Sequence, residues 1–173
     1  AGLTAAKHLA EDGYDVAILE KRLSMGGGMW GGGMSFPVAV VQEEAADLVK
    51  EIDVNLKRKE GYFVADSVEL ASKTTAGAID AGAKIFNNIT VEDVLIRSED
   101  KVEGVVINWS SILIAGLHVD PLAIRSDVVI EASGHDAEIL QVLKEKIPEE
   151  ESKLKTPTKE RPMWAERGEK EVV

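Results

Sequence analysis

The sequence contains no cysteine, and this absence excludes disulfide bonds, thiolate metal ligands and a cysteine nucleophile within the chain. It has no apolar run near the roughly 18 residues that a membrane-spanning helix needs, and no recognisable signal peptide. Its 20 basic residues are outnumbered by 31 acidic ones, which gives a formal net charge of −11. Such a charge argues against nucleic acid or an anionic membrane surface as a partner. We therefore expect a soluble, cytoplasmic protein.

Glycine, by contrast, is concentrated in one place: six of the eight positions over 26–33 are glycine. This loop follows a short apolar strand, expected over 15–20, that ends in Glu20. An acidic residue at the end of a strand can bind the two hydroxyls of a ribose, and a loop with few side chains lets backbone N–H groups approach a ligand closely. Together the two features predict a nucleotide site.

The alternative for the glycine-rich loop is a flexible linker. Linkers lack embedded bulky residues, whereas this loop contains or adjoins Met25, Met29, Trp30 and Met34. Large apolar side chains spaced by glycines favour a loop that is folded against the rest of the protein.

The order of the expected elements is typical of an α/β dinucleotide-binding domain. We expect helices over 2–12, 38–50, 67–81 and 137–146, and strands over 15–20, 56–57, 62–65, 83–86, 90–97, 101–109 and 127–131. The strands over 90–97 and 101–109 alternate as in an antiparallel hairpin around a turn at 99–100, and the charged segment over 149–171 is expected to be a loop. This layout predicts a single Rossmann-like domain of the flavin-disulfide-reductase type over residues 1–173, with inserted antiparallel strands.

Gly2 stands where the third glycine of a G-x-G-x-x-G fingerprint would stand. Glu20 lies 18 residues further on, close to the roughly 20-residue offset of the ribose-binding acid. Gly2 alone is an ordinary helical glycine, but followed by a strand, an acid and the glycine-rich loop it indicates dinucleotide binding. An α/β domain that binds no nucleotide is the alternative. The pattern begins inside the first helix, so we expect the first strand and a C-terminal segment of the fold to be missing from this sequence.

A second constellation consists of His118, Asp120 and His135. These are the only compact group in the sequence that resembles a set of metal ligands. Two imidazoles and a carboxylate suit non-haem Fe(II), and less selectively Zn(II) or Mn(II). Spacing alone leaves open that His118 packs in the core and that Asp120 caps a turn before Pro121.

Together, the motifs GGGMWGGGM, NWSSILIAGLHVDP and ASGHDAE resemble the thiamine thiazole synthase family, specifically its archaeal, sulfide-dependent branch. The resemblance covers essentially all 173 residues. It implies a transferase that consumes NAD as a substrate, releases nicotinamide, and condenses the ADP-ribose part with glycine and sulfur to an adenylated thiazole carboxylate. Some archaeal members bear the name ribose 1,5-bisphosphate isomerase, which is one rival activity. A flavin- or NAD-dependent oxidoreductase that shares only the fold is another.

By motif match, the resemblance implies a role for nine residues in all. Besides Gly2 of the fingerprint, it places Glu20 and Lys21 at the adenosine ribose, Gly28 at the dinucleotide, the backbone of Val91 at the adenine, and His118, Val119 and Asp120 at the reacting end. His118 and Asp120 would be catalytic. Asp120 and His135 would bind Fe(II) from neighbouring protomers, which implies a homo-oligomer (an octamer in relatives).

The missing cysteine gains a meaning from this resemblance. In the eukaryotic branch a cysteine of the motif gives up its own sulfur, whereas here the matching position is His118. The sulfur is therefore expected to come from outside, most simply as sulfide. The family's R-M-G-P-type motif, whose arginine holds the glycine carboxylate, is absent, so no residue is assigned to that task.

Overall fold

The computed structural model describes residues 1–98, 101–147 and 170–171, and the structural statements below refer to these residues. The helices are α1 (Gly2–Glu11), α2 (Ala46–Lys50), α3 (Ser67–Asp80), α4 (Ser110–Ile114) and α5 (Glu138–Lys146), with 3-10 turns η1 (Gly27–Gly31) and η2 (Glu43–Ala45). The strands are β1 (Ala17–Glu20), β2 (Val38–Gln42), β3 (Lys57–Lys59), β4 (Tyr62–Asp66), β5 (Lys84–Asn87), β6 (Ile89–Ser98), β7 (Lys101–Trp109) and β8 (Leu122–Arg125). No helix in this part of the chain is both long and apolar enough to cross a membrane.

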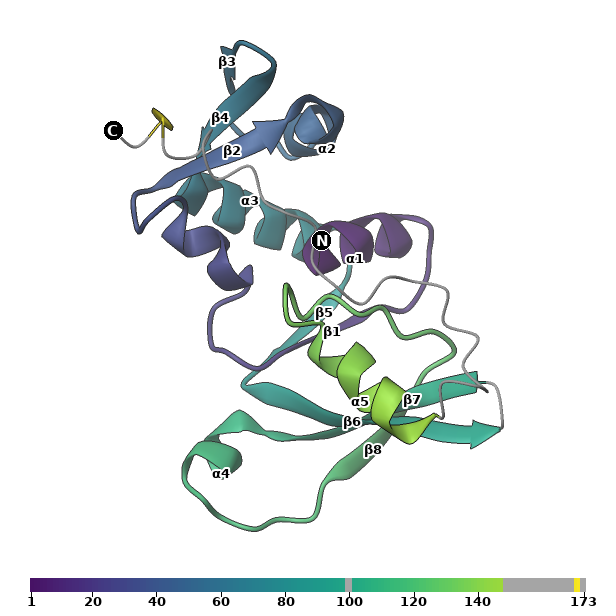
Figure 1. Cartoon of the computed structure of the whole chain (residues 1–173). Helices are drawn as coiled ribbons and strands as arrows, with labels where there is room; N and C mark the ends of the chain where they lie inside the picture. The colour runs from purple at the N-terminus through teal and green to yellow at the C-terminus, as the bar shows by residue number, and fades with distance from the viewer. Residues whose placement is uncertain (99–100, 148–169, 172–173) are drawn as a thin grey trace.

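The parallel pair β1–β5 lies at the centre of the molecule, with α1 and α3 packed together beside it (Figure 1). Its register runs from Ala17 opposite Lys84 to Glu20 opposite Asn87. Parallel strands need a crossover connection, and here it contains α3, which Gly82 ends at a φ of +102°. The expected α/β character of the fold is therefore confirmed.

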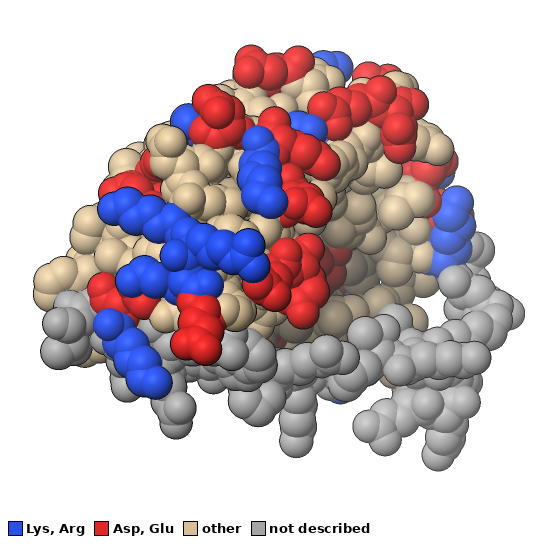
Figure 2. Space-filling model, turned by 90° about the horizontal axis from the view of Figure 1, so that it is seen from above, with Lys and Arg blue, Asp and Glu red and all other residues tan. Residues whose placement is uncertain are grey.

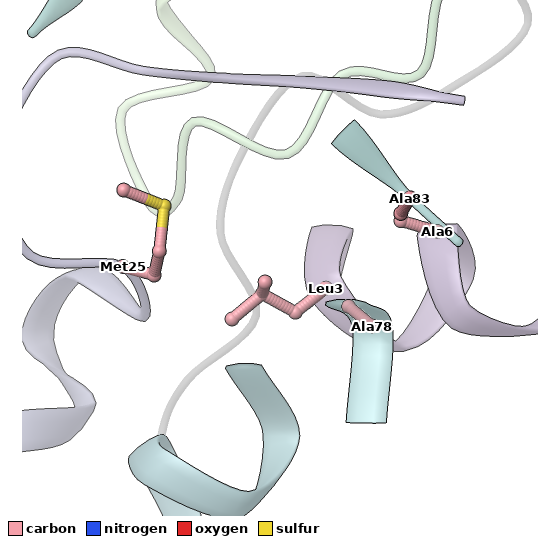
Figure 3. Packing of buried hydrophobic residues seen from close by; sticks show 5 residues of the cluster. All are labelled: Leu3, Ala6, Met25, Ala78 and Ala83. Carbon is pink, nitrogen blue, oxygen red and sulfur yellow. The ribbon is translucent and has the colours of Figure 1, made fainter. Parts of the chain in front are cut away.

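Small side chains allow these elements to approach each other closely. Figure 3 shows the core cluster of Leu3, Ala6, Met25, Ala78 and Ala83, which joins α1, α3, the start of β5 and the glycine-rich loop. Ala78 is fully buried, so α1 and α3 meet through alanine methyl groups. A larger residue at this point would push the two helices apart.

Two antiparallel sheets complete the fold, in the strand orders β2-β4-β3 and β6-β7-β8. The β6–β7 pair is the hairpin expected from the sequence. Strand β6 is at the edge of its sheet, so half of its backbone N–H and C=O groups point away from β7. The turn expected at 99–100 and the loop expected over 149–171, apart from 170–171, lie outside the described residues.

Two predicted elements are wrong. Residues 38–42, expected to begin a helix, form strand β2, because their valines pair with β4 in a register that runs from Val38 opposite Asp66 to Gln42 opposite Tyr62. Residues 127–131, expected to be a strand, are extended but pair with none of the described strands. Val128 and Ile130 are therefore exposed. A strand needs a hydrogen-bonded neighbour. The free edge of β7 is occupied by β8, which was not predicted.

Candidate functional site

Glu20 occupies the carboxyl end of β1, the edge at which parallel sheets bind ligands. Its Oε1 accepts a hydrogen bond from the backbone N–H of Arg22 at 2.8 Å, which fixes the orientation of the carboxylate. The neighbouring Lys21 forms an ion pair with Glu138, the first residue of α5, at 2.6 Å between Nζ and Oε1. Asn88 donates its backbone N–H to the carbonyl of Arg22 at 3.1 Å, so this turn is attached to the end of β5. The predicted ribose-binding residues thus lie on a braced turn.

The glycine-rich loop is folded, and the linker alternative is wrong. Met25 is buried in the core cluster, and Met29 packs against a second cluster around Val41 and Leu70. The indole of Trp30 donates to the carbonyl of Met25, and the carbonyl of Trp30 accepts from the hydroxyl of Ser67 at 3.3 Å. Met34 is the exception, because 70% of its surface is exposed.

Two glycines of this loop differ sharply in their surroundings. A Cβ on Gly32 would lie 2.2 Å from the carbonyl oxygen of Phe36 and 2.6 Å from that of Val38, and the residue has a φ of +52°. Gly32 is therefore required by the fold. Gly28, in η1, is exposed, and a Cβ there would meet no other atom within 4 Å. Its backbone faces open space, as the predicted contact with a dinucleotide requires.

Gly2, the other predicted nucleotide residue, lies at the start of α1, where the chain passes close to the segment over 131–136. A Cβ on Gly2 would approach the Cβ of Ala132 to 3.0 Å. The glycine therefore has a packing reason of its own, and its contact with a ligand stays a prediction. The same approach brings the loop that contains His135 to the N-terminal end of α1.

Glu131 organises the loop of His135, and sequence reasoning missed this residue. Its Oε1 accepts from the backbone N–H of Ser133 at 2.5 Å, and its Oε2 accepts from that of Ile139 at 2.9 Å. The hydroxyl of Ser133 in turn accepts from the N–H of Glu138 at 2.9 Å. One carboxylate thus bridges the two ends of the loop. The available signal was an acid at the end of an apolar run, the same pattern that singled out Glu20.

His118, Val119 and Asp120 lie on the loop between α4 and β8, and all three are exposed. The alternative in which His118 packs in the core is therefore wrong. The carbonyl of Val119 accepts a hydrogen bond from the Nδ2 of Asn108 in β7 at 3.2 Å. Val91 lies on the edge strand β6 opposite Ile107, and its backbone contact with an adenine stays a prediction.

The predicted metal ligands are not gathered within one copy of the chain. Among residues 1–98, 101–147 and 170–171, no three histidine, cysteine or acidic side chains lie close enough to hold a metal ion. His118, Asp120 and His135 are thus not the compact group that their spacing suggested. Their exposed imidazole and carboxylate groups are chemically suited to Fe(II), but a site here would need ligands from beyond the described residues of one copy.

Shifted pKa values occur away from these loops, on α1, on α3 and at the β3–β4 hairpin. The hydroxyl of Tyr62 donates to Oε1 of Glu171 at 2.6 Å, and Nζ of Lys59 lies 2.9 Å from Oε2. The Tyr62 hydrogen bond, followed by Lys59, holds the pKa of Glu171 below its ordinary value. Figure 2 shows basic side chains gathered on the upper face of the molecule with acidic ones among them. Ion pairs such as those of Arg58 with Glu43 and of Lys59 with Glu171 bring the two kinds of charge together.

Comparison with known proteins points to one family. The sequence model described as the Thi4 family matches residues 1–173. A protein of Methanothrix thermoacetophila named thiamine thiazole synthase is 53% identical over the whole chain, and a protein of the same name from Methanosarcina mazei is 49% identical. The chain spans 66% and 67% of their lengths.

Solved structures give the same picture. The crystal structure of Thermovibrio ammonificans THI4 matches with a TM-score of 0.80 and 44% identity over 83% of this chain and 57% of that one. The FAD-dependent halogenase CndH matches with a TM-score of 0.59 at 14% identity over 81% of this chain and 36% of its own. At that identity the likeness shows the fold alone, and it agrees with the expected flavin-type architecture.

Proposed function

The chain belongs to the Thi4 family, as the sequence motifs predicted, and on this premise we propose that the protein makes the adenylated thiazole carboxylate of thiamine biosynthesis from NAD, glycine and sulfide. Nicotinamide leaves in the reaction, and the ADP-ribose part of NAD becomes part of the product. The chain covers about two thirds of its relatives, so the proposal concerns the whole protein of which these residues are part.

The placement of Glu20 supports this proposal most directly. The residue lies at the carboxyl end of a parallel strand, with its carboxylate oriented by the N–H of Arg22. Its second oxygen can accept from a ribose hydroxyl. Lys21 can reach a ligand at the same place once its ion pair with Glu138 opens. Both side chains of that pair are nearly half exposed, so opening it costs only about 0.2–1 kcal/mol.

The reacting end would be completed by a second copy of the chain. We propose that Asp120 of one copy and His135 of another hold Fe(II) in a homo-oligomer. Fe(II), when bound, supplies open coordination positions suited to sulfide and to a nitrogen donor. The apolar surface around the loop supports an interface here, because Ile114 is 86% and Leu117 61% exposed next to His118.

The proposed source of sulfur rests on the residue at position 118. His118 stands at the motif position of the sulfur-donating cysteine, and the chain contains no thiol. A residue that cannot lose sulfur allows repeated turnover, provided that sulfide is supplied. His118 and Asp120 then have the task of exchanging protons with the substrates, for which exposed side chains on one short loop are suited.

The test is anaerobic incubation of the full-length protein with Fe(II), NAD, glycine and sulfide, followed by mass spectrometry. We expect the adenylated thiazole in amounts that exceed the enzyme, and none when sulfide is omitted. Product without sulfide would contradict the external source of sulfur. Conversion of ribose 1,5-bisphosphate to ribulose bisphosphate without thiazole formation would favour the isomerase. Purification with bound flavin and a reducible spectrum would favour an oxidoreductase.

The sharing of the metal between copies has its own test. Asp120→Ala and His135→Ala are each expected to be inactive. Mixing the two variants and letting their subunits exchange should restore about a quarter of the activity, because one in four random pairings unites an intact Asp120 with an intact His135. A site formed within one copy would stay inactive in every mixture.

A further inference from the structure

Asn108 is a buried polar residue that follows the apolar run over 105–107 in β7. It lies in β7 with 4% of its surface exposed, next to the buried Ile107. Burying an amide costs free energy unless its donors and acceptor are paired. The Oδ1 of Asn108 accepts from the backbone N–H of Trp109 at 2.9 Å, and its Nδ2 donates to the carbonyl of Val119 at 3.2 Å. Both polar atoms of the buried side chain are therefore paired with backbone groups.

The second contact acts on the middle of the loop between α4 and β8. The loop's start is fixed by the N–H of Leu117, which donates to the carbonyl of Ile112 at 3.1 Å. Its end is fixed where Leu122 of β8 pairs with Ile107 of β7. Between these points, the Asn108 amide holds the peptide that joins Val119 to Asp120. The bond therefore restrains the peptide plane from which Asp120 continues.

We propose that Asn108 is a positioning residue for the reacting end, acting on Asp120 and His118 through the carbonyl of Val119. This inference rests on the proposed function, since it assigns Asn108 a role only through those two residues. Asn108 itself contacts no substrate. Its amide is the link between a rigid strand and an exposed loop that has to keep one geometry in order to react.

The informative variant is Asn108→Asp, which keeps the acceptor for the N–H of Trp109 and replaces the donor to Val119 by an oxygen. The matched control is Thr90→Val. Thr90 is the cross-strand neighbour of Asn108, and its hydroxyl bonds to Ser110 at 2.7 Å and not to the peptide between Val119 and Asp120. Asn108→Ser serves as a second variant if the aspartate does not fold, since its short hydroxyl cannot span the distance to Val119.

Four quantities are measured on the full-length protein: the melting temperature, the Kd for NAD, kcat for thiazole formation, and the visible absorption of Co(II) added in place of iron. We expect Asn108→Asp to lower kcat by about 10- to 100-fold beyond Thr90→Val, because misplacing a reacting group by about 1 Å has that effect. The Kd for NAD should stay within twofold of the unmodified protein. The Co(II) bands should change in position or intensity, because Asp120 is a proposed ligand.

Either the extra loss of kcat or the change in the Co(II) bands supports the proposal. A variant that matches Thr90→Val in both quantities overturns it. If the unmodified protein forms no thiazole, the proposed function fails. The role of Asn108 is then decided by the Co(II) bands alone.

Discussion

Replacing Gly32 by alanine should damage the fold far more than replacing Gly28, although only four positions separate them in the same loop. The new Cβ at residue 32 would meet backbone atoms at 2.2–2.8 Å, and backbone cannot rotate away as a side chain can. The turn after it would have to move, which breaks the bond from the N–H of Gly33 to the carbonyl of Val38 at 2.8 Å and that from the N–H of Val38 to Phe36 at 2.7 Å.

The magnitude follows from these losses. Forcing a residue with a side chain into this backbone region costs about 1–3 kcal/mol. Two backbone hydrogen bonds add about 0.5–1.5 kcal/mol each. Gly32→Ala should therefore lower the free energy of unfolding by about 2–6 kcal/mol, a large part of the total for a domain. Gly28→Ala should leave it unchanged or raise it by up to about 1 kcal/mol, since its backbone suits alanine and its surroundings are open.

The assay is urea unfolding followed by tryptophan fluorescence, because Trp30 lies in the loop itself. Gly32→Ala should shift the midpoint to lower urea, whereas Gly28→Ala should keep it. Calorimetric titration with NAD separates the second role: Gly28→Ala should weaken NAD binding at unchanged stability, since a methyl group would hold the dinucleotide away from the backbone. Equal midpoints for the two variants would refute the packing argument. Unchanged NAD affinity in Gly28→Ala would refute the predicted contact.

Three further outcomes are expected. Glu131→Gln should lower the free energy of unfolding by about 1 kcal/mol, measured by urea titration, because an amide nitrogen cannot accept from a backbone N–H as the half-buried carboxylate does. Tyr62→Phe should raise the pKa of Glu171 toward its ordinary value in an NMR titration, because the hydroxyl is the main cause of the lowering. Folding lowers this pKa, so the contribution of Glu171 to stability is present above its ordinary pKa and is lost as the pH falls through the lowered value. An NMR titration midpoint of Glu171 that Tyr62→Phe leaves unchanged would contradict this account. Ala78→Leu should cost about 1–3 kcal/mol between α1 and α3, whereas Ala76→Leu, exposed on the same helix, should cost almost nothing in the same urea assay.

The fold could be predicted where local patterns agree with the final structure. Helix α3 has apolar residues at helical spacing and ends at Gly82, and the β6–β7 hairpin alternates along both strands, so neither depends on distant parts of the chain. Strand β2 depends on β4, and the segment over 127–131 lacks a partner among the described strands. Whether an extended segment becomes a strand is decided by its neighbour, which one segment's sequence does not specify.

The candidate residues of the site could be chosen by residue type, but the sequence did not show which of them the fold brings together. The acid after β1 and the glycine-rich loop could be recognised by residue type; the structure places Glu20 at the carboxyl end of β1 and leaves Gly28 exposed, and their contacts with a nucleotide stay predictions. His118, Asp120 and His135 are separated by a strand and two loops, so their spacing did not reveal that one copy keeps them apart. Glu131 and Asn108 were missed because both bind backbone atoms. A contact with the backbone involves only one side chain, so the sequence contains no matching residue type by which it could be recognised.

Because Met25 is buried by the folded glycine-rich loop, oxidation of its side chain would report how often that loop opens. In a chain without cysteine, methionine is the side chain that peroxide oxidises most readily. Met34 is open to solvent, whereas Met25 is closed off in the core by the folded loop. Peroxide should convert Met34 to its sulfoxide at once and reach Met25 only at the rate at which the loop detaches. The ratio of the two sulfoxides in a peptide digest would then measure how often the loop opens, and whether NAD holds it shut.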